Sequence, residues 1–160
     1  MKKIFFFVFV FIFSFNLSFL PNTSLAQIKW GNGEVKMSKQ AFDQFFIYLK
    51  GSSYAKPLYF LLTTDGENGY WWWCPGISDV TCDKEHPIEA LKIHFLLNSP
   101  KAIKKCEIYY KGKKCEFFAI KRIIKWKNSK NFGKGKNSII SSNLSKYEVK
   151  QRLMKLGFIN

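Results

Sequence analysis

Apolar residues recur at helical spacing in two stretches that also carry helix-end signals. Ser38 is a favourable N-cap and Gly51 a favourable C-terminal cap, and the stretch between them has three phenylalanines and a leucine on one helical face. This pattern predicts an amphipathic helix over Lys39–Lys50. Near the C-terminus, Ser145 and Glu148 have the spacing of a capping box, which predicts a second helix within residues 144–160.

Four other apolar runs are short and rich in strand-forming residues. Residues 58–63 and 70–74 flank a cluster of turn-forming residues at 65–69, which predicts a β-hairpin. Residues 115–119 and 123–126 flank a basic turn and predict two more strands. The sequence therefore predicts a small antiparallel sheet of about four strands.

Residues 87–110 have helical potential with an apparent interruption. Ser99 is a favourable N-cap and Pro100 suits the first position of a helix, so the pattern predicts two helices, over 87–98 and 101–110. Helices and strands in this order favour an α+β domain over residues 27–126, with the helices on one face of the sheet. Residues 127–143 are rich in Lys, Asn, Ser and Gly and predict a flexible basic linker. The helix within 144–160 is expected to dock on the domain or on a partner.

The first 26 residues have the layout of a secretory signal peptide. Two lysines precede an unbroken apolar run over residues 4–13, and Ser24 and Ala26 provide small residues before a cleavage point. A retained membrane anchor is the alternative, although the apolar stretch is shorter than the about 20 residues of a comfortable span. The expected location is the periplasm or the exterior of the cell. With the signal peptide cleaved, no membrane span is expected.

Charge is distributed unevenly along the chain. Residues 27–91 have six Lys and eight Asp or Glu, whereas residues 92–160 have eighteen Lys or Arg and three Glu. Such an excess favours attraction to anionic surfaces. A genome that favours Lys codons explains the choice of Lys over Arg, but not the placement of the excess in one half.

The four cysteines predict two disulfides in an exported protein. Pairing of Cys74 with Cys82 and of Cys106 with Cys115 closes two short loops and is the simplest of three connectivities. Pairing between the two halves is the main alternative. Zinc is disfavoured because neither pair has the tight spacing of a zinc knuckle, and no metal or cofactor is expected.

Short motifs between Tyr59 and Trp126 carry a family resemblance. They are LLTTDG at 61–66, GY at 69–70, CP at 74–75, and a pattern A-x3-C … C-x2-aromatic-A … W that ends at Trp126. The series resembles a group of uncharacterised small exported proteins of alphaproteobacteria. It is also distantly similar to a bacterial domain-of-unknown-function family built on a Cys-bearing helix and strand. The resemblance implies a periplasmic, disulfide-bearing module and assigns no activity.

Two sets of residues are candidates for ligand binding. Because neighbours on a strand face opposite sides, Trp71 and Trp73 share one face of the predicted strand, where they either stack on a ligand or pack against a covering element. The second set is basic and lies around two predicted turns, where it forms either one anion-binding patch or a solvated surface. Its members are Lys104, Lys105, Lys111, Lys113, Lys114, Lys121, Arg122 and Lys125.

These features favour an exported, non-enzymatic binding or envelope-associated module of unknown specificity with a basic helix–hairpin surface. An anionic component of the cell envelope or a protein is the expected partner. Export argues against nucleic acid as the partner. The alternative function is an accessory subunit that binds a protein partner through its tail helix and aromatic strand. A small periplasmic hydrolase that uses His86 and the acidic residues around it is the third hypothesis, disfavoured because neither His86 nor His94 lies in a recognisable catalytic motif.

Overall fold

The structure is a computed structural model that describes residues 28–51, 55–75 and 88–160, with backbone alone at 55, 74–75 and 88–98. Its elements run in the order α2 (Lys39–Lys50), β1 (Ala55–Thr63), β2 (Gly69–Pro75), α3 (Ile88–Tyr109), β3 (Cys115–Ile120), β4 (Ile123–Ile124), a short 3-10 helix (Lys136–Ser138) and α4 (Lys146–Lys155). The predicted signal peptide lies outside the described residues. No helix in the described ranges is both long enough and apolar enough to cross a membrane.

The predicted helix over Lys39–Lys50 is confirmed with its ends. The Ser38 side chain accepts a hydrogen bond from the Ala41 amide, and Gly51 ends the helix with a φ of 61°, where a side chain would be strained. Phe45 and Leu49 are completely buried on the side that faces the sheet. Local capping and apolar spacing thus agree with the tertiary packing of α2.

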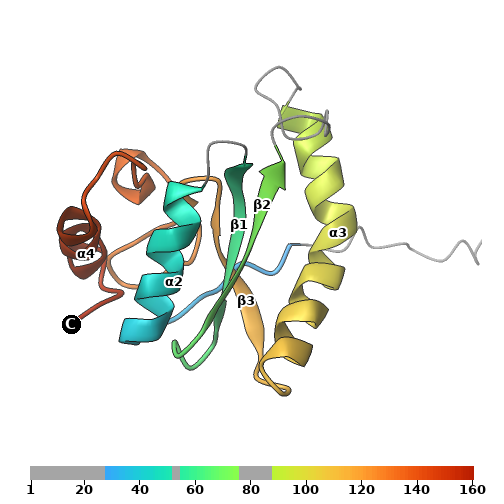
Figure 1. The fold of residues 1–160 in the computed structure, drawn as a ribbon, viewed down its shortest axis with the longest axis horizontal. Helices are drawn as coiled ribbons and strands as arrows, with labels where there is room; N and C mark the ends of the chain where they lie inside the picture. Colours follow the sequence, from blue (N-terminus) through green and yellow to red (C-terminus); the bar gives the residue numbers. More distant parts are fainter. Residues whose placement is uncertain (1–27, 52–54, 76–87) are drawn as a thin grey trace, which may run out of the picture.

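The four strands form one antiparallel sheet in the order β2-β1-β3-β4, which confirms the predicted α+β class. Figure 1 shows β1, β2 and β3 between α2 and α3. The hairpin turn between β1 and β2 is closed by Asp65, whose carboxylate accepts hydrogen bonds from the Thr63 hydroxyl and the Glu67 amide. β2 lies at one edge of the sheet, and β1 and β3 form its centre.

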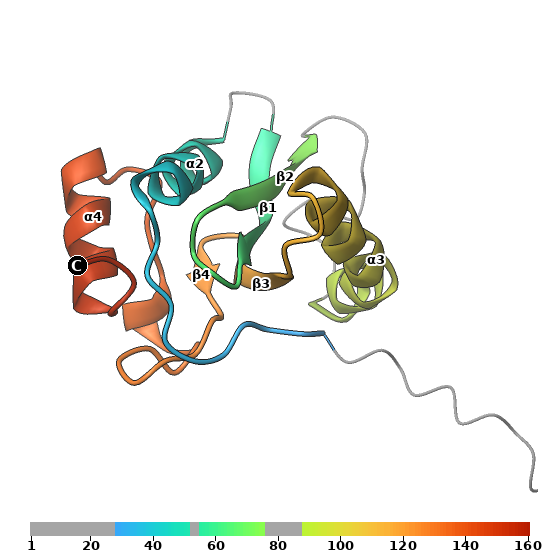
Figure 2. The same cartoon turned by 90° about the horizontal axis from the view of Figure 1, so that it is seen from below.

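Helices cover both faces of the sheet, whereas the sequence predicted helices on one face. α2 lies on one side, with α4 beside it, and α3 lies on the other side (Figure 2). The reason is that the two central strands are apolar on both faces: residues 60–62 of β1 and 117–119 of β3 are consecutive and completely buried. A strand with two apolar faces needs a layer on each side.

α3 is one continuous helix, whereas the sequence predicted two helices separated at Ser99 and Pro100. Pro100 lies inside the helix and is exposed, and Ser99 is buried. Ala102 and Cys106, one turn apart, pack against Leu61 and Phe117 of the sheet. Packing of the turns after the proline, together with the buried Ser99, helps to keep the helix continuous despite the lost backbone hydrogen bond.

Residues 127–143, predicted as a flexible linker, are instead packed into the fold. Asn131 and Ser138 are buried and hydrogen-bonded to each other at 2.7 Å, and Ile140 belongs to the core. α4 then docks on the domain, since Leu153 and Phe158 are completely buried. Some polar side chains of this segment therefore form buried hydrogen bonds, while others are exposed to solvent.

Candidate functional site

The outward side of α3 combines lysines with an exposed apolar residue. Lys101, Lys104, Lys105 and Ile108 have the spacing i, i+3, i+4 and i+7, which places them on one side of the helix. All four are exposed, and Ile108 is 69% exposed. Within the described part of the chain, none of the three lysines has a carboxylate within ion-pair distance. No carboxylate of the described residues therefore compensates these three charges.

Trp72 of the edge strand extends this surface. Its side chain is 45% exposed, and the Lys105 ammonium lies 5.3 Å from the centre of a Trp72 ring. A cation at this distance is attracted by the face of the ring. This contact joins α3 to the edge of the sheet through one aromatic–cation pair.

The predicted binding pair, Trp71 and Trp73, faces the opposite side and packs against the core that includes α2. Trp71 stacks on Phe60 with ring centres 6.5 Å apart, and the Trp73 indole N–H donates a hydrogen bond to the Tyr48 carbonyl at 3.2 Å. The alternation of faces was predicted correctly. These contacts give Trp71 and Trp73 a role in packing the fold. Of the three consecutive tryptophans, Trp72 is the exposed one.

Tyr109, near the end of α3, is 69% exposed and contacts the same edge strand through Tyr70. Its ring centre is 6.0 Å from that of Tyr70, which precedes Trp72 by two positions on the same face of β2. The neighbouring Tyr110 hydroxyl donates to the Gly69 carbonyl at 2.6 Å and so ties the end of α3 to β2. We name the resulting region the α3–β2 surface; it consists of Trp72, Lys101, Lys104, Lys105, Ile108 and Tyr109.

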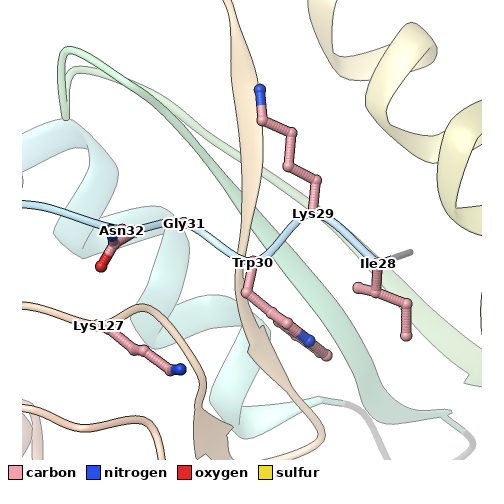
Figure 3. A pocket seen from close by; sticks show the side chains of 6 residues that line it. All are labelled: Ile28, Lys29, Trp30, Gly31, Asn32 and Lys127. Atoms are coloured by element: carbon pink, nitrogen blue, oxygen red, sulfur yellow. The ribbon is translucent and has the colours of Figure 1, made fainter. Parts of the chain in front are cut away.

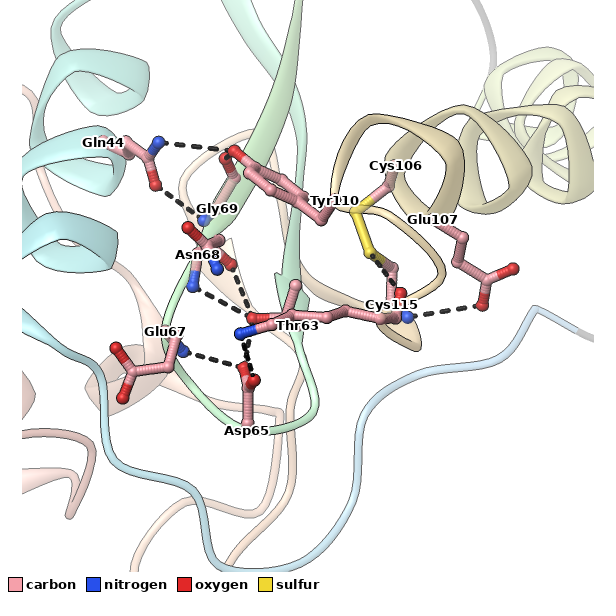
Figure 4. The surroundings of a disulfide bond; sticks show 11 residues. Gln44, Thr63, Asp65, Glu67, Asn68, Gly69, Cys106, Glu107, Tyr110 and Cys115 are labelled. Carbon is pink, nitrogen blue, oxygen red and sulfur yellow. Dashed lines mark hydrogen bonds and ion pairs between the residues drawn. A yellow bond between two sulfur atoms is a disulfide. The ribbon is translucent and has the colours of Figure 1, made fainter.

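A disulfide holds α3 against the sheet next to this surface (Figure 4). Cys106 in α3 is bonded to Cys115 at the start of β3, which confirms one predicted pair. The Glu107 carboxylate also accepts a hydrogen bond from the Cys115 amide at 3.4 Å. The other predicted pair, Cys74 with Cys82, lies outside the residues whose side chains are described.

An ion pair lies at the same end of the sheet. The Lys113 ammonium is 2.7 Å from the Asp65 carboxylate. Burial raises the pKa of the Asp65 carboxyl, but hydrogen bonds from Lys113, Thr63 and the Glu67 amide outweigh burial and lower the pKa to about 2. The positive charge of Lys113 is therefore paired with the Asp65 carboxylate, so Lys113 adds little to an anion-binding surface.

The predicted single basic patch is not formed, because its two turns lie at opposite ends of β3. Lys111 and Lys114 precede the strand, whereas Lys121 and Arg122 follow it. Six residues of strand separate the turns by about 20 Å. Both Lys111 and Lys121 have positive φ values, which marks each as a tight turn. Lys125 is half-buried beyond the second turn.

A shallow pocket of about 500 Å³ lies beside the N-terminal segment (Figure 3). It is lined by residues 28–32 and by Lys127. Backbone bridges join Trp30 to Phe117 and Asn32 to Lys127, so the segment runs along the sheet rather than forming a separate linker. Lys29 is paired with Glu116 at 3.0 Å, which leaves Lys127 as the cation of this pocket without an ion-pair partner in the described ranges.

Metal-binding groups do not cluster in the part of the chain with described side chains. No cluster of three or more His, Cys, Asp or Glu side chains there has a geometry suited to a metal ion. His86 lies outside the described residues, and α3 is described at His94 by its backbone alone. The hydrolase hypothesis therefore stays a prediction.

Of the predicted basic residues, the structure brings Lys104 and Lys105 into the α3–β2 surface. The sequence-based prediction missed Trp72, Lys101, Ile108 and Tyr109. Helical spacing over 101–108 was available as a signal, but it identifies the outward side only once the buried side of α3 is known. Comparison with known proteins finds no matching family model, no matching curated protein and no matching solved structure.

Proposed function

We propose that this protein is an exported, non-catalytic module that binds anionic lipid surfaces through the α3–β2 surface. The observation that carries the proposal is the contact of the exposed Trp72 with Lys105. Beside it lie Lys101 and Lys104, which have no carboxylate partner among the described residues, and the exposed Ile108 and Tyr109. The Cys106–Cys115 disulfide is compatible with an oxidising compartment outside the cytosol.

The side-chain chemistry favours lipid over a purely charged polymer. Lysines interact with lipid phosphates, while Trp and Tyr are the side chains enriched at the level of lipid headgroups. Ile108 is 69% exposed next to them and is suited to contact the acyl boundary. A purely charged ligand would gain little from the isoleucine exposed at the end of this row of lysines.

The expected affinity is modest and depends on salt. A lysine near an anionic membrane contributes about 1 kcal/mol, so three lysines contribute about 3 kcal/mol. Raising the salt concentration from about 0.1 M to about 1 M shortens the screening length from about 10 Å to about 3 Å and weakens this contribution.

The test is flotation of the protein with vesicles of phosphatidylglycerol and phosphatidylcholine in equal parts. Reversing Lys101, Lys104 and Lys105 to Glu removes about 3 kcal/mol of attraction and adds repulsion between the new carboxylates and the lipid. Partitioning to the vesicles is therefore expected to fall at least about a hundredfold. Pure phosphatidylcholine vesicles and high salt are expected to release the unchanged protein.

The matched control reverses Lys130, Lys134 and Lys136 to Glu, which makes the same change in net charge. These lysines are exposed in the segment before α4, on a different part of the molecule, near the exposed Phe132. This control is expected to keep most of the vesicle binding. An equal loss in both variants would show attraction by net charge alone, and either that result or no vesicle binding would overturn the proposal.

A further inference from the structure

A pocket of about 290 Å³ lies between α2 and α4, on the opposite side of the sheet from the α3–β2 surface. Met37 and Phe42, both buried, and the partly buried Ile159 provide its apolar part. Figure 2 shows α4 running beside α2 with the C-terminus close by. The pocket is therefore built from two segments that are far apart in the sequence.

Three lysines and one carboxylate provide the polar part of this pocket. Asp43 lies 3.0 Å from the Lys39 ammonium and 2.8 Å from the Lys146 ammonium. Lys150, one turn after Lys146 on α4, is exposed and has no carboxylate within ion-pair distance in the described ranges. Among the side chains that line the pocket, three positive charges against one negative charge give a sum of about +2 at neutral pH.

The positions of the two lysines on α4 follow from local structure. Ser145 and Glu148 form the predicted capping box, which starts α4 at Lys146. The Lys146 ammonium also lies 5.8 Å from the centre of the Phe42 ring, so it is held between the carboxylate and an aromatic face. Lys150 has neither contact and is available to a ligand.

We propose that the α2–α4 pocket binds a small organic acid: a carboxylate or phosphate group on an apolar body about the size of one aromatic ring. The acid group pairs with Lys150 and with the surplus charge of the Lys39–Asp43–Lys146 cluster. The apolar body packs on Met37, Phe42 and Ile159. The pocket volume is at the lower end of the range for small-molecule sites, which limits the body to this size.

The test uses two fluorinated probes, 4-fluorobenzoate and 4-fluorophenyl phosphate, titrated with the full chain and followed by ¹⁹F NMR. Binding of either acid is expected, and the tighter one identifies the acid group. Lys150→Glu is expected to weaken binding at least about tenfold, because it replaces the free cation by an anion. Neutral 4-fluorobenzyl alcohol is expected to bind much more weakly than either acid.

Lys155→Glu is the matched control, since Lys155 is exposed on the same helix but does not line the pocket. It makes the same change in net charge and is expected to change the affinity less than about twofold. Equal weakening by both variants, or no binding of either acid, would overturn the proposal. Lys150→Glu is expected to keep vesicle binding, so this proposal and the lipid-binding proposal fail independently.

Discussion

Trp71, Trp72 and Trp73 are adjacent in the sequence but lie in two different environments. The first and third pack against the core that includes α2, and the middle one faces solvent beside Lys105. Alternation along a strand produces this division, because successive side chains point to opposite faces. At the scale of single residues, burial therefore separates a structural role from the proposed binding role within three positions.

Trp73→Ala and Trp72→Ala form a matched pair that tests this division. Trp73→Ala is expected to lower the free energy of unfolding by about 2–3 kcal/mol, through lost packing and the lost hydrogen bond to Tyr48. Trp72→Ala is expected to cost less than about 1 kcal/mol, because the side chain is exposed, while reducing vesicle binding. Urea denaturation and flotation measure the two effects, and equal stability losses would contradict the assignment.

At the scale of elements, α3 depends on interactions outside its own sequence. Its continuity through Pro100 costs one backbone hydrogen bond. Its position is fixed by the disulfide from Cys106 to β3 and by the hydrogen bond from the Tyr110 hydroxyl to the Gly69 carbonyl of β2. The same attachments hold Lys105 over Trp72. The contacts that fix the position of the α3–β2 surface thus lie at the C-terminal end of the helix.

Pro100→Ala is expected to raise the free energy of unfolding by about 1 kcal/mol or more, because alanine restores a backbone donor inside a continuous helix. Thermal unfolding followed by circular dichroism measures the change. Lys101→Ala, the adjacent exposed position, serves as the control and is expected to change stability by a few tenths of a kcal/mol. A loss of stability in Pro100→Ala would instead indicate a separate helix that begins at Pro100.

At the scale of the whole molecule, the C-terminal segment completes the core on the α2 face. Phe158 packs on Phe118 with ring centres 4.9 Å apart, and the Met37 amide donates to the Phe158 carbonyl at 2.8 Å. Val149 and Leu153 add the buried side of α4. The apolar side of the tail helix is thus used within the domain.

Removal of residues 144–160 is therefore expected to abolish cooperative unfolding, since it exposes the core around Phe118. Leu153→Ala is the milder version and is expected to cost about 2–5 kcal/mol, whereas Tyr147→Ala, at an exposed position of α4, is expected to be nearly neutral. Urea titrations compare the three. A truncated chain that still unfolds cooperatively would show that α4 is an appendage.

The sequence by itself determined the features that depend on neighbouring residues. The ends of α2 follow from Ser38 and Gly51, the start of α4 from its capping box, and the hairpin from the turn at Asp65, because each uses hydrogen bonds within a few residues. The Cys106–Cys115 pair was predicted for the same reason: it closes a short loop.

Only the tertiary structure decided which surfaces these elements cover and which they leave open. Contacts between distant residues decided three features: α3 lies on the second face of the sheet, Ile140 is buried, and the two basic turns lie at opposite ends of β3. Apolar spacing shows that a side chain needs a partner but does not identify the partner. Both the α3–β2 surface and the α2–α4 pocket therefore emerge from the packing of segments distant in the sequence.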